Sequence, residues 1–82
     1  VKRVLKHIRV NDATKACTIT LTSSKYVNIY WGDGSVDYDI SGDAVKITHN
    51  YDVNGDYFPV VTGCVDEISS FETNAIIVWE RI

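Results

Sequence analysis

The stretch Val27-Asn28-Ile29-Tyr30-Trp31-Gly32-Asp33-Gly34-Ser35 decides the predicted fold. Apolar Val27, Ile29 and Trp31 alternate with Asn28 and Tyr30, which is the period-two pattern of a half-buried β-strand. The Asp33-Gly34 pair tolerates the positive φ that a tight hairpin turn requires. We therefore expect a strand over 26–31, with Trp31 in the core, and a turn with Gly34 at positive φ.

Turn residues divide the rest of the chain into short segments typical of strands. Residues 15–22 alternate, with Cys17, Ile19 and Leu21 facing inward, and a turn is expected at 23–25. After the hairpin the strand returns from Val36 to a second turn. The later segments are expected to be a turn at 41–43, strands at 44–49, 56–64 and 75–82, and a polar, irregular stretch at 66–73 whose Ile68 and Phe71 pack onto the end of the sandwich.

The N-terminal segment, residues 1–10, leaves two interpretations open. Its apolar residues have helical spacing, but Val4, Lys6, Ile8 and Val10 also fit one face of a strand with a lysine out of place. Short, regularly spaced strands elsewhere favour the strand. We predict a single domain over 1–82, an all-β antiparallel sandwich of about seven strands.

Three spaced motifs resemble the signature of PKD (polycystic kidney disease) domains. They are Trp31-Gly32-Asp33-Gly34-Ser35, Thr48-His49-Asn50-Tyr51 and Gly55-Asp56-Tyr57, and the resemblance covers about residues 15–82. It implies an immunoglobulin-like β-sandwich that serves as a non-catalytic module on bacterial surface proteins, secreted enzymes and phage proteins. It also implies structural roles for Trp31, Gly32, Asp33, Gly34, His49, Tyr51, Gly55 and Tyr57. Pro59 stands where the family has an inward apolar residue, and the two cysteines are not part of its pattern.

Tyr57 and the cysteines carry further structural expectations. Tyr57 opens a strand directly after a loop, as in a tyrosine corner, where the hydroxyl bonds a backbone group upstream. Cys17 begins its strand and Cys64 ends another strand that runs in the same direction. This separates them by roughly 20 Å, beyond the ~7 Å Cα limit of a disulfide. We expect two free thiols, which favours a reducing compartment over secretion.

Catalytic and metal-binding patterns are weak in this chain. Six aspartates gather around the expected turns, and Ca²⁺ prefers such oxygen ligands. Their spacing is not that of an EF-hand, and aspartates commonly cap turns. His7 and His49 are the two histidines, without a catalytic or metal-ligand motif around them. We expect no enzyme activity, no cofactor and no metal site. The aspartates are Asp33, Asp37, Asp39, Asp43, Asp52 and Asp56.

Charge and surface patterning suggest an interaction role. Residues 1–10 carry four cations and no acid, whereas the whole chain has a net charge of −3. An acidic body argues against nucleic-acid binding, and no apolar run is long enough to enter a membrane. The basic segment either protects an edge strand or meets an acidic partner. The outward aromatic face of two strands either docks a partner or stabilises the sheet by cross-strand pairing. The candidate binding residues are Tyr26, Tyr30, Phe58, Val60, Lys2, Arg3 and Lys6.

The expected function is a module that docks on, or projects from, a larger protein assembly. Its small size, lack of a signal sequence and free thiols favour a phage virion accessory protein of the capsid-decoration or head-fibre type, on the virion surface. The alternative is an adhesion or carbohydrate-binding module of a bacterial surface protein or secreted hydrolase, which would be extracellular and bind glycans. Fold analogy permits both functions and establishes neither.

Overall fold

A computed structural model of the 82-residue chain describes residues 2–80. All strand pairs are antiparallel and form one sheet of seven strands. The elements are β1 (Arg3–Arg9), η1 (Asp12–Thr14), β2 (Ala16–Tyr30), β3 (Val36–Asn50), β4 (Gly55–Tyr57), β5 (Val60–Gly63), η2 (Val65–Glu67), β6 (Ile68–Thr73) and β7 (Ile76–Glu80). The predicted all-β architecture is confirmed. The expected strand positions at Val1, Arg81 and Ile82 lie outside the described residues.

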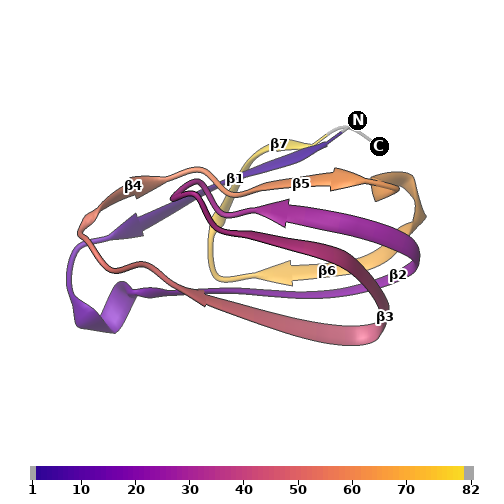
Figure 1. The fold of residues 1–82 in the computed structure, drawn as a ribbon, viewed down its shortest axis with the longest axis horizontal. Helices are drawn as coiled ribbons and strands as arrows, with labels where there is room; N and C mark the ends of the chain where they lie inside the picture. Colours follow the sequence, from indigo (N-terminus) through magenta and orange to yellow (C-terminus); the bar gives the residue numbers. More distant parts are fainter. Residues whose placement is uncertain (1, 81–82) are drawn as a thin grey trace.

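The sheet folds over into two layers because β2 and β3 each pass through both (Figure 1). Residues 16–21 of β2 pair with 45–50 of β3, and β6 pairs on the other side of β2, in the lower layer. Residues 27–30 of β2 pair with 36–40 of β3 and with β5 in the upper layer. The upper layer continues from β5 to β1 and then to β7.

The predicted turns at 23–25 and 41–43 are bends inside continuous strands. The chain reverses there, as Figure 1 shows, but the ladder continues because Ser23 pairs with Gly42. Ser23 is buried at the bend, and its hydroxyl donates a 2.6 Å hydrogen bond to the carbonyl of Lys25. A buried hydroxyl needs such a partner. The prediction of separate strands was therefore wrong at both places.

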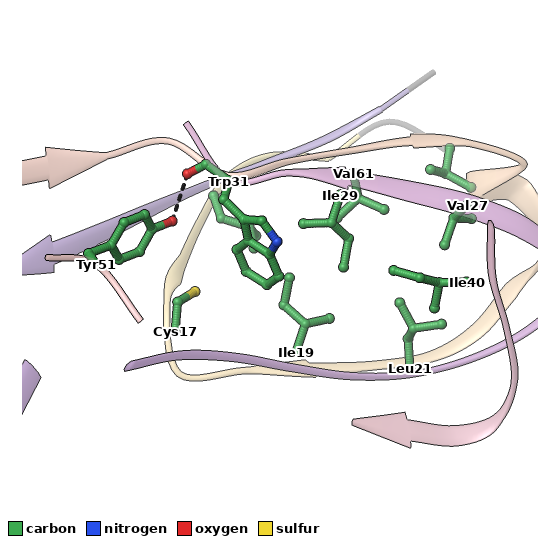
Figure 2. Packing of buried hydrophobic residues seen from close by; sticks show 11 residues of the cluster. Cys17, Ile19, Leu21, Val27, Ile29, Trp31, Ile40, Tyr51 and Val61 are labelled. Carbon is green, nitrogen blue, oxygen red and sulfur yellow. Dashed lines mark hydrogen bonds between the residues drawn. The ribbon is translucent and has the colours of Figure 1, made fainter. Parts of the chain in front are cut away.

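The hydrophobic core lies between the layers (Figure 2). Ile19 and Leu21 of the lower layer face Val27 and Ile29 of the upper one, and all are fully buried. Trp31 is 0 % exposed, as predicted, and its indole N–H donates a 2.9 Å hydrogen bond to the Asp37 carboxylate. That bond satisfies the polar end of an otherwise apolar side chain.

β1 is a strand, but the set of residues expected to share its inward face was wrong. Arg3, Leu5 and His7 are buried, whereas Val4 and Lys6 are half-buried and Ile8 is exposed. Arg3 is 4 % exposed, and its guanidinium carbon lies 4.4 Å from the centre of the Phe71 ring. Cation–π contact and stem packing allow a cation to face inward here.

The two C-terminal expectations also need correction. The strand expected over 56–64 is divided into β4 and β5, because Pro59 has no N–H for the ladder. Pro59 is nevertheless buried, and its carbonyl accepts a 2.8 Å hydrogen bond from the Leu5 N–H. Residues 66–73 are not irregular but form most of η2 and all of β6. Ile68 and Phe71 pack against the core, as predicted.

Candidate functional site

The residues of the PKD-like signature form a connected aromatic cluster at one end of the core. The Tyr51 hydroxyl donates a 2.7 Å hydrogen bond to the carbonyl of Trp31 (Figure 2). The Tyr51 ring stacks on Tyr57 at 3.9 Å between centroids, and the His49 ring stacks on Trp31 at 4.9 Å. Burial raises the pKa of the Tyr51 hydroxyl. The cluster connects the C-terminal ends of β2 and β3 with β4, so these side chains stabilise the packing of three strands.

Asp33 fastens the hairpin turn to β3. Its carboxylate lies 2.7 Å from His49 Nε2 and accepts a 3.1 Å hydrogen bond from the Ser35 N–H. Partial desolvation raises the pKa of the Asp33 carboxyl, but the hydrogen bonds from His49 and Ser35 outweigh it and the pKa lies below its ordinary value. His49 is thus a structural partner of the turn.

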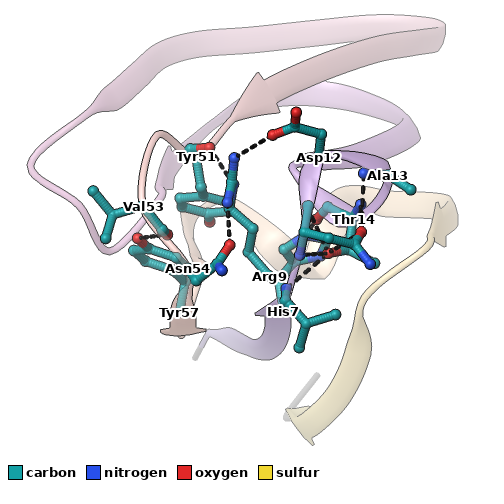
Figure 3. Close-up of polar contacts among 11 residues, drawn as sticks. His7, Arg9, Asp12, Ala13, Thr14, Tyr51, Val53, Asn54 and Tyr57 are labelled. Atoms are coloured by element: carbon teal, nitrogen blue, oxygen red, sulfur yellow. Dashed lines mark hydrogen bonds and ion pairs between the residues drawn. The ribbon is translucent and has the colours of Figure 1, made fainter.

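The loop between β3 and β4 is fixed by β1 and by its own tyrosine (Figure 3). The Tyr57 hydroxyl donates to the Val53 carbonyl, which confirms the tyrosine-corner prediction. Arg9 donates from Nε to the Tyr51 carbonyl at 2.7 Å, and its terminal nitrogens contact Asn54 and Asp12. Arg9 belongs to the N-terminal segment that was expected to form a free basic edge. In the structure its guanidinium instead holds the loop between β3 and β4 in place.

The candidate binding residues with apolar side chains come together on the outer face of the upper layer. Tyr30 pairs directly with Val60, and Asn28 pairs with Thr62, so their side chains lie on one face as predicted. Tyr26 and Phe58 are exposed and lie in the same two chain segments, at opposite ends of this face.

This face extends further than the sequence indicated. Val60 pairs with Val4 of β1, and Val4 pairs with Trp79 of β7. Tyr30 also pairs with Val36 of β3, next to the exposed Tyr38, whose ring contacts Tyr30 edge-on at 6.2 Å. The run of four apolar residues that begins β7 was a signal in the sequence, but a strand of unknown pairing could not be placed on a face. We name the row Val36, Tyr30, Val60, Val4 and Trp79, with its neighbours Tyr38 and Ile76, the upper apolar face.

The three predicted basic residues do not share one surface. Lys2 is exposed, with its amine 5.4 Å from the centre of the Trp79 ring, and Lys6 is half-buried on the same face as its partner Ile76. Arg3 points into the interior instead. Its inclusion in an exposed docking edge was wrong, whereas Lys2 and Lys6 border the upper apolar face.

The outer face of the lower layer has the opposite chemistry. Thr20 pairs with Lys46 on one side and with Glu72 on the other, and Thr18 pairs with Thr48. Threonine and charged side chains are the usual outward residues of a solvated sheet. One domain thus carries one polar outer face and one apolar outer face.

Other parts of the surface bring together few chemically useful groups. A hollow of about 280 Å³ beside η1 includes His7, but His7 Nε2 is already 2.7 Å from the Thr14 carbonyl. Within residues 2–80, no group of three or more His, Cys, Asp or Glu side chains has metal-binding geometry. Cys17 and Cys64 are both free, as predicted, and burial raises the pKa of Cys17 to about 11.

No protein-family model, curated protein or solved structure matches this chain. The resemblance to PKD domains therefore stays a prediction from the motifs. Within the described part of the chain, no helix has the length and apolar character needed to cross a membrane.

Proposed function

We propose that this chain is a non-catalytic β-sandwich interaction module that docks on, or projects from, a larger protein assembly through its upper apolar face. The contrast between its two outer faces carries the proposal. Solvated faces of antiparallel sheets are normally polar, and the lower layer follows that rule. An apolar patch with exposed tyrosine and tryptophan is typical of protein interfaces.

The setting that we propose for the module is a phage virion surface, as a capsid-decoration or head-fibre type protein. This part rests on the resemblance of residues 31–35, 48–51 and 55–57 to PKD domains and on two free cysteines. Lys2 and Lys6 border the apolar face and would speed encounter with an acidic partner surface.

Co-sedimentation tests this function. Labelled protein is mixed with virions, empty capsids and cell envelopes purified from the source culture, at low and high salt. Tyr30→Ala should weaken docking by more than ~1 kcal/mol, about fivefold in affinity, if Tyr30 is central. Thr48→Ala on the lower layer is the matched control and should bind like the parent protein.

Changes at the basic border give a second readout. A protein with both Lys2→Gln and Lys6→Gln should keep its fold and lose the salt dependence of docking, because exposed charges are screened within ~10 Å at 0.1 M salt. Equal sedimentation of all variants at every salt concentration would reject this face as the docking site. Binding to a glycan array without binding to any assembly would replace the proposal with a carbohydrate-binding module.

A further inference from the structure

The upper apolar face is exposed to solvent in the described part of the chain. Its exposed members include Tyr38 at 63 % and Trp79 at 43 %, and they lie at opposite ends of a row that crosses five strands. Nothing within residues 2–80 covers them. A continuous apolar face of this kind on a small domain marks an interface.

We propose that a second copy of this chain packs face to face on the upper apolar face. This inference rests on the proposed function, because it takes the same docking surface and names what occupies it. Two sheets that pack face to face keep their strands within about 30° of each other and lie about 10 Å apart. The pair would bury the two upper apolar faces against each other.

Charge complementarity selects the second copy and its orientation. Lys2 lies beside Trp79 at the β1–β7 end of the face, and Asp39 belongs to β3 at the other end; both lie on the same side of the row along the strand direction. A two-fold axis parallel to the strands places β3 of one copy over β7 of the other, which brings Lys2 of each copy toward Asp39 of the other. A two-fold axis across the strands would place lysines over lysines, which is unfavourable.

The irregularity of β7 argues for packing on the face rather than strand addition at the edge. β7 pairs with β1 alone within the described residues, so its other edge is open. However, Val4 pairs with Trp79 and Leu5 with Ile77, which leaves Val78 as an extra residue. Such a bulge distorts the edge and hinders a further strand.

The size of the face suits a weak to moderate dimer. The molecule measures 35 × 21 × 20 Å, so its broad side offers at most about 700 Å² (35 × 20), near the lower bound of ~600–1,000 Å² per partner for specific interfaces. We therefore expect reversible, concentration-dependent association.

Sedimentation velocity and light scattering from about 5 µM to about 1 mM test the proposal on the protein alone. The parent should rise from its 9.2 kDa mass toward twice that value. Tyr38→Lys, at a highly exposed position, should weaken association at least tenfold, and Thr48→Lys on the lower layer should leave it unchanged. Unchanged thermal unfolding of both variants shows that each remains folded.

A zero-length carbodiimide cross-linker tests the orientation. In one copy, Lys2 and Asp39 are separated by three strand spacings of about 4.8 Å, too far for a direct bond between their side chains. A Lys2–Asp39 cross-link in a mixture of isotopically light and heavy protein should therefore join a light chain to a heavy one. Cross-links confined to single chains would overturn the orientation.

The failure of this inference is distinguishable from failure of the proposed function. A parent protein that stays monomeric at about 1 mM, or a dimer lost with Thr48→Lys and kept with Tyr38→Lys, overturns the second copy as occupant. If that same monomer sediments with virions and loses binding with Tyr30→Ala, the docking function stands with a different partner.

Discussion

Trp31 is held from several sides, which makes it the residue on which stability depends most. Its ring lies against His49, its indole N–H bonds Asp37, and its carbonyl accepts the Tyr51 hydroxyl. Trp31→Ala should cost ~3–5 kcal/mol in the free energy of unfolding, because it leaves a cavity and removes the hydrogen-bond donor of the Asp37 carboxylate. Urea denaturation measures this loss. Trp79→Ala, at a 43 % exposed position, is the control and should cost less than about 1 kcal/mol. Similar losses for both would contradict the central role of Trp31.

Asp33 links stability to acid pH. Its folded-state pKa lies below the ordinary value of 3.8, so its contribution to stability is fully present above that pH. The contribution is lost as pH falls through the lowered folded-state pKa. Melting temperatures measured from pH 6 to about pH 2 should therefore fall less steeply for Asp33→Asn than for the parent. Asp52→Asn removes an exposed carboxylate and serves as the control. Identical slopes for the parent and Asp33→Asn would refute the linkage.

At the scale of elements, the hairpin turn after β2 has two glycines with different tasks. Gly34 has φ +95°, as predicted, and nothing lies within 4 Å of where a Cβ would stand. Gly32 has φ +90°, and its Cβ would stand 3.2 Å from the backbone nitrogen of Phe58. Gly34→Ala should cost about 1 kcal/mol from the positive φ alone. Gly32→Ala should cost clearly more, because it also pushes on the segment between β4 and β5. Equal urea midpoints for the two variants would show that the close approach is unimportant.

The elements also show how far sequence patterns reach. Strict alternation correctly predicted which side chains around Ile19 and Ile29 face inward, because burial of apolar side chains alone decides the orientation of these strands. The face of β1 could not be predicted, because Arg3 and His7 turn inward only where Phe71 and Tyr51 offer partners from distant segments. β6 was missed because an edge strand with a polar outer face has few apolar residues. The residues around Ser23 and Gly42 are typical of turns, so the sequence predicted that the strands end there. Only the pairing of Ser23 with Gly42 shows that the ladder continues through the bend.

The candidate site was predictable in part for the same reason. Tyr30 and Val60 were placed on one face because the alternation within each strand shows which residues point outward. Trp79 and Val4 could not be added without knowing that β1 lies between β5 and β7. Such an arrangement is a property of the whole sheet, and no local pattern reports it.

At the scale of the whole molecule, the fold has no covalent cross-link between its described cysteines. Native protein should react with a thiol reagent once, quickly, at exposed Cys64. Cys17 should react only on unfolding, because burial raises its pKa to about 11 and blocks access. Reductant should leave the melting temperature unchanged. A melting temperature that falls on reduction would contradict the free thiols.

The pairing of Arg3 with Glu80 places the two ends of the described chain on adjacent strands of the same layer. Strand neighbours are about 4.8 Å apart, so a host polypeptide that carried this domain inside one of its surface loops would have to open that loop very little. Domains with adjacent ends are tolerated as insertions for this reason. The same geometry means that a pulling force on the two ends would peel β1 from β7 one hydrogen bond at a time rather than shear the whole ladder. A domain with such ends would thus be easy to graft into another chain, and it would yield under load at the β1–β7 pair.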